Sequence, residues 1–352
     1  MLTSNSAQGL PVNDRLCGVF SHFLTIMDHS VQLLGISNAI VDILAHIEDD
    51  FLDKIVAVPG SMTLIDRDRA REIYALMGPA TEMSGGSVAN TVAGFANLGG
   101  SSAYIGRVSA DQLGGIFNHD MRSLGVDVRL QAAKDGLPTA RSHILITADG
   151  QRTMQTYLGA CTELSVDDVT TETMGTPKAV LIEGYVWDLP EGPDLTAKAM
   201  EIAKQNGTTV ALSLSDSFCV ERHRESFEHA VRTGVDIVVA DEDEVKALLQ
   251  TESFEESLEA LDGFDNLFAI TRSDKGSVIV HGDQLIVQAA DPIDAVVDTT
   301  GAGDAYTAGF LYGWVNDMSL AECAKIGTFC GSTVIQQVGA RIEPGLLDDY
   351  RG

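Results

Sequence analysis

The 352-residue chain is poor in basic residues: 23 Lys and Arg stand against 51 Asp and Glu, which leaves a formal net charge of −28. A protein that holds nucleic acid or an acidic membrane by general electrostatic attraction needs the opposite balance. We therefore expect neither nucleic acid nor a membrane among its partners. Anionic substrates must be held by local devices instead, such as backbone amides or a single arginine.

Cysteine is also scarce, and its spacing follows no pattern. No two cysteines form a CxxC pair, and the five are scattered as Cys17, Cys161, Cys219, Cys323 and Cys330. Neither a zinc site nor a disulfide framework is indicated. The simplest interpretation is a protein of the reducing cytoplasm.

The first 30 residues differ from the rest of the chain. LCGVFSHFLTIM (residues 16–27) is too short to span a bilayer, is interrupted by Ser21 and His22, and lacks a small-residue cleavage site. We treat residues 1–30 as an N-terminal extension of uncertain status. Met27 lies just before the first clear strand, so residues 1–26 are as consistent with a misassigned or dispensable segment as with a native one.

Apolar strands and helical segments alternate along most of the chain. VQLLGI (31–36) is a short buried strand, and AVLIEGY (179–185) followed by DLTAKAMEIAKQNG (194–207) is one of several strand–helix pairs. Repeated units with β-branched apolar strands predict an α/β fold: a doubly wound, mostly parallel sheet flanked by helices on both faces.

One region breaks this alternation. TARSHILITADGQRTMQTYLG (139–159) contains two alternating strands around an Asp149-Gly150 turn, which predicts an antiparallel hairpin. Because such a hairpin does not belong in a doubly wound sheet, we expect a separate small β lid made of residues 43–82 and 128–158. The large α/β domain would then comprise residues 31–42, 83–127 and 159–346.

A glycine-rich stretch near the C-terminus, DAVVDTTGAGDAYTAGF (294–310), is the first candidate for chemistry. Residues 294–298 are predicted as a strand and the residues after Gly303 as a helix. GAG then lies at a helix N-terminus, where free N–H groups and the helix dipole favour an anion. A Walker A loop is excluded because the chain contains no GK[ST], and GAGDAY lacks the last glycine of a dinucleotide fingerprint.

What remains is an anion hole formed by the amides of Gly301, Ala302 and Gly303, followed at once by the carboxylate of Asp304. The amides would stabilise the charge of a transferred phosphoryl group, and the carboxylate would accept the proton of an attacking hydroxyl. On spacing alone, a glycine-rich helix start that Asp304 merely caps is an equal alternative.

Two stretches resemble one known family. DTTGAGDAYTAGF (298–310) closely resembles the C-terminal signature of the ribokinase-like (PfkB) carbohydrate and nucleoside kinases, and SGGSVANTVAGFANLGG (84–100) resembles their N-terminal signature. The two occur in the family order, and the resemblance covers roughly residues 31–345. Three further stretches are most similar to the adenosine kinase subgroup: LLGISNAIVDIL, LSDSFCVERHRESF and VIQQVGAR.

The resemblance implies an acceptor side to the site. In the family, an Asp after the first strand binds a pair of sugar hydroxyls, and the matching residue here is Asp42; a turn carboxylate is the alternative interpretation. Asn38 is expected near the ribose or base. Gly86, Ser87 and Asn90 are expected to contact the sugar, although the glycine would serve a tight turn before a helix whatever the substrate.

The resemblance also implies a nucleotide side. Arg152, at the start of the second lid strand, matches an arginine that closes over the γ-phosphate in adenosine-kinase-like members, and a guanidinium can pair bidentately with phosphate oxygens. A lone surface arginine is the alternative. TRSDKGSVIV (271–280) resembles the family's nucleotide-binding strand and turn. The implied contacts to ATP are Thr271, Ser273, Gly276 and, from the penultimate helix, Thr328.

The implied cofactor is Mg²⁺, with ATP as co-substrate, and members of the family often use a monovalent cation such as K⁺. VADEDEV (239–245) departs from the family's Asn-x-x-Glu pattern, because Asp241 replaces the Asn that precedes Glu244. Two carboxylates at a helix start could hold the hydration shell of Mg²⁺, but DEDE is also an ordinary acidic first helical turn. Asp298 is the candidate for the monovalent cation.

Together these residues imply an ATP-dependent kinase that moves the γ-phosphate to a primary hydroxyl, with the adenosine 5′-OH as the expected acceptor. A sugar kinase of the same family, acting on ribose, fructose or a relative, is the alternative. A catalytically silent nucleotide sensor is a third, which Asp304, the intact GAG and Arg152 argue against. We expect a monomer or a homodimer formed through the lid. Pairing through the lid requires an apolar outer face on the hairpin, and HILIT (143–147) is apolar enough to supply one.

Overall fold

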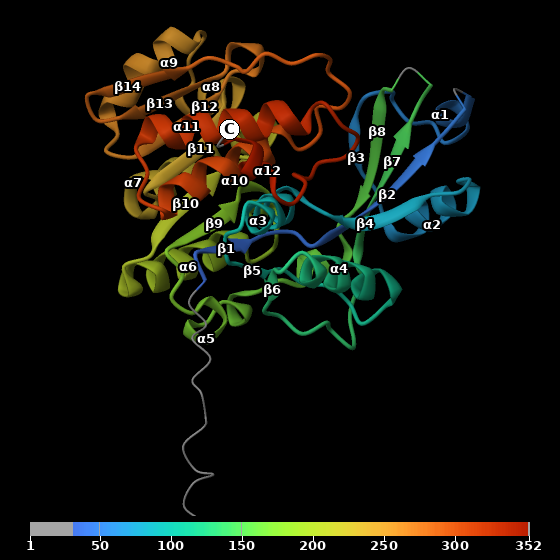
Figure 1. The fold of residues 1–352 in the computed structure, drawn as a ribbon. Coiled ribbons are helices and arrows are strands. Elements are labelled where there is room, and N and C mark those ends of the chain that lie inside the picture. Colours follow the sequence, from blue (N-terminus) through green and yellow to red (C-terminus); the bar gives the residue numbers. More distant parts are fainter. Residues whose placement is uncertain (1–30, 49, 149, 351–352) are drawn as a thin grey trace, which may run out of the picture.

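The computed structural model describes residues 31–48, 50–148 and 150–350, and these residues form two β-sheets (Figure 1). In spatial order, the strands of the larger sheet are β14 (Gln284–Gln288), β13 (Ser277–His281), β12 (Leu267–Thr271), β11 (Ile237–Asp241), β10 (Thr209–Ser213), β9 (Ala179–Glu183), β1 (Leu33–Ile36), β5 (Ser102–Ile105) and β6 (Asp127–Val128). Every neighbouring pair from β12 to β6 is parallel, whereas β13 and β14 are antiparallel additions at one edge.

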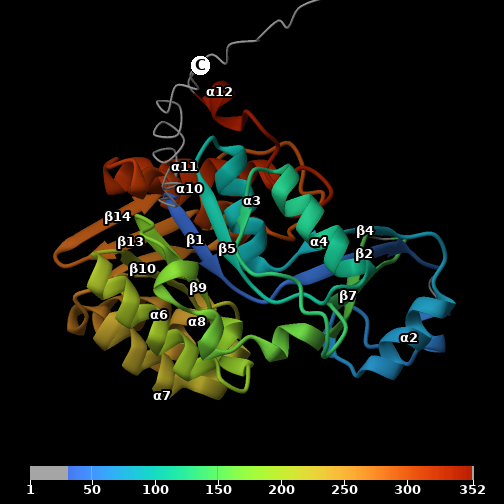
Figure 2. The same ribbon diagram turned by 90° about the horizontal axis from the view of Figure 1, so that it is seen from below.

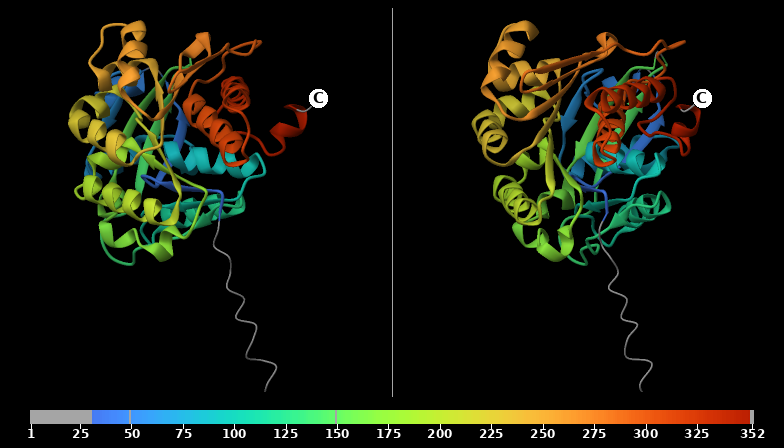
Figure 3. Two further views of the ribbon diagram at one scale, coloured as in Figure 1. Left: turned by 90° about the vertical axis from the view of Figure 1, so that its left-hand side faces the viewer. Right: turned by 60° about the vertical axis from the view of Figure 1, so that its left-hand side comes forward.

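Helices cover both faces of this sheet. One face packs against α3 (Ser87–Asn97), α4 (Gln112–Ser123), α10 (Ala302–Val315) and α11 (Leu320–Val334), and the other against α6 (Gly192–Asn206), α7 (Ser217–Gly234), α8 (Glu242–Leu249) and α9 (Phe254–Ala260) (Figures 2 and 3). Successive strand residues enter opposite cores: Leu33 lies in the first and Leu34 in the second, both fully buried. The predicted doubly wound, mostly parallel sheet is confirmed.

The smaller sheet lies beside the larger one (Figure 1). Its strands, in spatial order, are β3 (Met62–Leu64), β8 (Arg152–Tyr157), β7 (Ala140–Ile146), β2 (Ile40–His46) and β4 (Thr81–Gly85). The predicted hairpin is present, since β7 and β8 pair antiparallel from Arg141 with Tyr157 to Ile146 with Arg152. Helix α1 (Asp50–Lys54) contributes Leu52 and helix α2 (Arg67–Leu76) contributes Ile73 to a small core, which Ile55, just after α1, and Leu145 complete.

Two local expectations were wrong. Residues 294–298 form no strand, because the amides of Val297 and Asp298 both donate to the carbonyl of Ile335 after α11 instead of to a neighbouring strand. The HILIT segment does not form an outer lid face, because its apolar residues from Ile144 to Ile146 are buried. The large apolar side chains of the lid that are exposed are instead Val56, Val58, Met62, Leu64, Tyr74, Leu76 and Leu137.

Strand membership differs from the expected division of the chain at two short segments. Ile40–Asp42 and residues 83–85 pair with each other at one edge of the lid sheet, whereas the sequence placed both in the large domain. The remaining helices are α5 (Thr171–Met174) and α12 (Leu346–Tyr350). Four cysteines, Cys161, Cys219, Cys323 and Cys330, are free and buried. Cys17 and the expectations for residues 1–30 lie outside the described residues, and within them no helix has the length and apolar character needed to cross a membrane.

Candidate active site

A cavity of about 720 Å³ lies where the carboxyl ends of β11 and β12 meet the start of α10. Parallel strands present their carboxyl ends at one edge of the sheet, and this is the edge at which α/β folds bind ligands. The predicted residues that line the cavity are Ser87, Asp241, Glu244, Thr271, Ser273, Gly276, Gly301, Ala302, Gly303, Asp304 and Thr328. The other candidates, Asn38, Asp42, Gly86, Asn90, Arg152 and Asp298, do not line it.

The start of α10 leaves backbone N–H groups without partners. Gly301 caps the helix with φ at +77°, a left-handed conformation that glycine adopts without strain. The amide of Ala302 donates to the carbonyl of Thr299 (3.3 Å), whereas those of Gly301, Gly303 and Asp304 have no hydrogen-bond acceptor among the described residues. Free N–H groups at a helix N-terminus are suited to an anion. Of the three amides predicted to form an anion hole, that of Ala302 is already used and those of Gly301 and Gly303 are free, and the anion hole itself stays a prediction.

Asp304 lies half-buried on the first turn of α10 and is held by two side chains from α3. Ser87 Oγ donates to Oδ1 (2.6 Å), and Asn90 Nδ2 donates to Oδ2 (3.0 Å). Burial raises the pKa of Asp304 to about 6, while these hydrogen bonds and the charge of Arg341 act in the opposite direction. Each carboxylate oxygen keeps a lone pair for a further proton donor, so Asp304 is equipped to act as a base near neutral pH.

Helix α3 is placed for this contact by a glycine. Gly86 caps the helix with φ at +97°, and a Cβ there would lie 2.7 Å from the carbonyl oxygen of Asn38. Ser87 and Asn90 are three residues apart in the helix and so lie on one face, which is turned toward Asp304. The Asn90 amide donates to Asp304 and accepts from Arg341, so both of its ends are bonded to protein groups.

Two further candidates for the acceptor side, Asp42 and Asn38, do not line the cavity. Burial raises the pKa of Asp42 to about 7; Arg341 lowers it, and the neighbouring charge of Asp304 raises it further. Asn38 donates its backbone N–H to Glu183 (3.0 Å), and its Oδ1 is buried with no partner among the described residues. An unsatisfied buried carbonyl oxygen is costly unless a ligand or water meets it.

Two residues in this region were missed by the sequence analysis. Arg341, in the segment after α11, donates from Nε to Asn90 Oδ1 (3.2 Å) and from Nη2 to the Ser84 carbonyl (2.7 Å). Glu183, at the end of β9, is 1% exposed and accepts hydrogen bonds from Ser37 Oγ and the Asn38 amide. No motif identified either residue. The available signals were, for Glu183, a carboxylate at the end of a continuously apolar strand and, for Arg341, its place in the VIQQVGAR stretch.

The nucleotide-side candidates lie around the turn between β12 and β13. Thr271 ends β12, Ser273 opens a 3-10 turn, and Gly276 adopts φ at +88° just before β13. Thr328 reaches the same cavity from α11, is 6% exposed, and its hydroxyl has no partner among the described residues. The structure thus brings these four residues to one wall, and their contacts to ATP remain a prediction.

The two acidic candidates for the metal form a capping box at the start of α8. Asp241 Oδ1 accepts the Glu244 amide (2.8 Å), and Glu244 Oε2 accepts the Asp241 amide (2.9 Å). Each residue keeps one carboxylate oxygen outside the box, and both line the cavity. No cluster of three potential metal ligands occurs among residues 31–48, 50–148 and 150–350. A capping role and a role through bound water are therefore compatible.

Arg152 and Asp298 are bound to each other. Arg152 Nη2 lies 2.5 Å from Asp298 Oδ2, and Nη1 donates to Thr300 Oγ1 (2.7 Å). The Asp298 carboxylate also accepts the amides of Thr300 (3.0 Å) and Gly339 (2.8 Å). The arginine of the lid thus reaches the segment just before the free amides of α10, and the proposed cation ligand is already neutralised by it.

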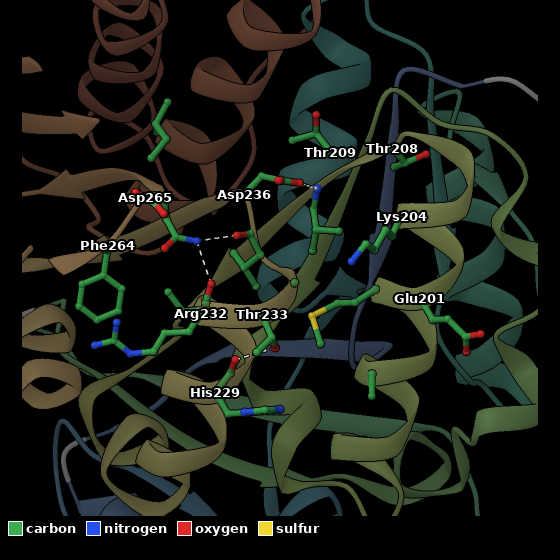
Figure 4. Close-up of a pocket in the computed structure, with 18 of the residues that line it drawn as sticks. Glu201, Lys204, Thr208, Thr209, His229, Arg232, Thr233, Asp236, Phe264 and Asp265 are labelled. Carbon is green, nitrogen blue, oxygen red and sulfur yellow. Dashed lines mark hydrogen bonds between the residues drawn. The ribbon is translucent and has the colours of Figure 1, made fainter. Parts of the chain in front are cut away.

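A second cavity, of about 1000 Å³, lies at the opposite edge of the sheet, at the amino ends of β10 to β12 (Figure 4). Two of its polar side chains hold neighbouring strands and loops: Asp236 accepts the amide of Val210 (2.7 Å), and Asn266 donates to the carbonyls of Val231 and Val235. The Arg232 guanidinium stacks 3.9 Å over the Phe264 ring. None of the predicted site residues lines this cavity.

The chain belongs to the pfkB family of carbohydrate kinases, because the model of that family matches residues 54–345. The fold is accordingly ribokinase-like, and the protein is an ATP-dependent kinase that phosphorylates an alcohol group. Kinases of this family use ATP and generally Mg²⁺.

Individual relatives come from both branches of the family. The crystal structure of adenosine kinase from Sinorhizobium meliloti is 46% identical, covers 92% of this chain and 99% of its own, and superposes with a TM-score of 0.85. The structure of a probable sugar kinase protein from Rhizobium etli CFN 42 is 44% identical, covers 91% and 98%, and has a TM-score of 0.84. Adenosine kinase 2 of Arabidopsis thaliana is 24% identical over 87% of this chain and 94% of its own.

Proposed function

We propose that the protein transfers the γ-phosphate of ATP to the 5′-OH of adenosine, giving AMP and ADP. The observation that carries the proposal is Asp304: a half-buried carboxylate with a raised pKa that lines a nucleotide-sized cavity beside free helix-start amides. The name of the Sinorhizobium meliloti relative supports adenosine as the acceptor. The Asn38 Oδ1 atom, buried without a partner among the described residues, offers an acceptor for a nucleoside amino or hydroxyl group.

In the proposed reaction, Asp304 takes the proton of the 5′-hydroxyl as its oxygen attacks the γ-phosphorus. The bond between that phosphorus and the β,γ-bridging oxygen breaks, and ADP leaves on the opposite side. The amides of Gly301, Gly303 and Asp304 stabilise the charge on the transferred group. Asp42 accepts hydrogen bonds from the ribose hydroxyls, and Arg152 leaves Asp298 to pair with the phosphate.

The residues at the start of α8 fit a Mg²⁺ ion that is bound by few protein ligands. The oxygens of Asp241 and Glu244 that lie outside the capping box are hard donors facing the cavity, and few protein ligands are required, because Mg²⁺ keeps water and substrate phosphate oxygens in its coordination sphere. When bound, it would offset the negative charge of the polyphosphate. A role for K⁺ at Asp298 stays a prediction, and it requires Arg152 to move.

A sugar kinase acting on ribose, fructose or a relative is the second candidate. It is favoured by the Rhizobium etli relative, whose similarity is close to that of the adenosine kinase. The proposed roles of Asp304, Asp42 and the amides would be the same for both acceptors. Only the groups around the nucleobase would differ.

The test is ADP release from Mg²⁺·ATP with adenosine, inosine, guanosine, ribose or fructose as acceptor, each compared with ATP alone. The proposal expects turnover on adenosine well above that on either sugar. Turnover on a sugar alone would replace the acceptor and leave the chemistry in place. Release no faster than with ATP alone, for every acceptor, would contradict the proposed function.

A further inference from the structure

Arg341 is a cation in a strongly acidic chain, and it lies behind the proposed base. Its Nε donates to Asn90 Oδ1 (3.2 Å), its Nη2 donates to the Ser84 carbonyl (2.7 Å), and the same Nη2 lies 3.8 Å from Met121 Sδ. These partners come from α3, from β4 of the lid sheet and from α4. Arg341 therefore links α3, whose Ser87 and Asn90 donate to Asp304, to β4 of the lid sheet.

The contacts of Asn90 have a direction. A side-chain amide has one acceptor end and one donor end. Oδ1 faces the Arg341 guanidinium, so Nδ2 faces Asp304 Oδ2 at 3.0 Å. In the reversed orientation the amide oxygen would face the Asp304 carboxylate and the NH₂ group would face the guanidinium, and both contacts would be repulsive. The two partners are thus compatible with only one orientation of Asn90.

Charge around Asp304 makes this orientation matter. Asp42, half-buried on β2, and Glu183, buried on β9, have carboxyl groups whose pKa values Asp304 raises, so they oppose its negative charge in turn. Arg341 is the charged group that acts on Asp304 in the opposite direction. Arg152, from β8, acts on Asp42 in the same sense. The remaining partners that face Asp304, Ser87 and Asn90 on α3, are neutral.

We propose that Arg341 is a positioning residue for the phosphoryl transfer, which locks Asn90 with its NH₂ group toward Asp304 and balances the carboxylates gathered around that base. The inference rests on the proposed function, because it assigns Arg341 through the role of Asp304. It adds a residue outside both signature stretches to the machinery of the site. It also makes the segment after α11 part of the active site, where the sequence analysis assigned a role to no residue.

The experiment compares Arg341→Met, Arg341→Lys and a control, Arg129→Met, in the full chain with the acceptor that the wild type uses. Arg129 is an arginine with a 6% exposed side chain, and it donates to the carbonyls of Thr173 and Met174 and to the carboxylate of Asp127. Folding is checked by thermal melting, and kcat and kcat/KM are measured from pH 5 to 9.

For Arg341→Met we expect kcat to fall about 10- to 100-fold, the effect of losing a hydrogen bond to a charged group. The acidic limb of the kcat/KM profile should move to higher pH by about one unit, because an opposite charge near Asp304 is lost. Arg341→Lys keeps the charge but not the planar fork, so its acidic limb should stay in place while kcat falls. Arg129→Met should leave the limb unmoved.

A coupling measurement separates this role from general packing. In an Asn90→Ala background, Arg341→Met should reduce kcat by much less than in the wild type, because its path to Asp304 is already broken. If Arg341→Met folds and keeps both the wild-type kcat and the wild-type limb, the inference is wrong. If it does not fold, Arg341→Lys decides: wild-type kcat there would equally overturn the inference. A wild type inactive on every acceptor would instead remove the proposed function.

Discussion

Gly301 caps α10 and Gly303 lies in its first turn, yet an added side chain should have opposite effects at the two positions. A Cβ built on Gly303 meets no atom within 4 Å and points into open space at the helix start. Alanine is also a better helix former than glycine by ~1 kcal/mol, so Gly303→Ala should fold at least as well as the wild type. The added methyl group would occupy space that we assign to the γ-phosphate. Displacing a reacting group by ~1 Å can cost about 10²-fold in rate, so we expect a fall of that order in kcat/KM for ATP.

Gly301→Ala is the matched comparison. Its Cβ would lie 2.5 Å from Ala340 Cβ and 2.6 Å from Ala340 Cα, and its φ of +77° is strained for any residue with a side chain. Left-handed strain of ~1–2 kcal/mol and overpacking of ~1–3 kcal/mol together predict a loss of about 2–5 kcal/mol in stability. Thermal melting and initial rates at varied ATP measure both effects. Full activity of Gly303→Ala, or an unchanged Tm for Gly301→Ala, would refute the reasoning.

Three further predictions concern charged groups. Arg152→Met should lower kcat by about 10- to 100-fold, because one hydrogen bond to a charged group is lost. It should also lower Tm, because Asp298 loses its ion pair. Steady-state rates and thermal melting measure the two effects, and a wild-type kcat would contradict a contact between Arg152 and the phosphate. Asp241→Asn keeps an effective helix cap, so Tm should hardly change while the dependence of rate on Mg²⁺ concentration becomes shallower; an unchanged Mg²⁺ titration would count against a role at the metal. Burial raises the pKa of Glu183 from 4.5 to about 7, so the folded protein binds a proton that the unfolded chain releases. The free energy of unfolding should therefore rise by up to about 3 kcal/mol as the pH falls from 8 to 5. Denaturant unfolding of the wild type and Glu183→Gln tests this, and equal slopes of unfolding free energy against pH for the two proteins would contradict it.

Patterns within single stretches of the sequence predicted those parts of the structure that depend on neighbouring residues. Alternating apolar strands and helices were sufficient for the larger sheet, because β1 and β9 to β12 are buried on both faces and read as continuous apolar runs. The helix start at Gly301 and its carboxylate followed from the glycine spacing alone. The Asp149-Gly150 turn predicted the β7–β8 hairpin, whose pairing the structure confirms although Asp149 itself lies outside the described residues.

Contacts between residues far apart in the sequence could not be predicted from patterns within single stretches. Nothing in the sequence pairs Arg341 with Asn90 or Arg152 with Asp298, because these contacts depend on how the lid and the last segment pack against α3 and α10. The apolar VV of residues 296–297 suggested a strand, but the amides of Val297 and Asp298 both donate to the carbonyl of Ile335 instead of to a strand. Asn90 matched a family position for the sugar, whereas the structure bonds it to Asp304 and Arg341.

The most direct test of the account is the single-turnover rate of Asp304→Asn with saturating ATP and acceptor. Asp291→Asn, which removes a carboxylate from the wall of the same cavity, is the control for charge. The account predicts that Asp304→Asn loses ~10²–10⁴-fold in rate, the usual contribution of a general base, with ATP and acceptor affinities nearly unchanged. Asp291→Asn should remain close to the wild type. Transfer by Asp304→Asn at a rate comparable to that of Asp291→Asn would contradict the central claim that Asp304 removes the proton of the attacking hydroxyl.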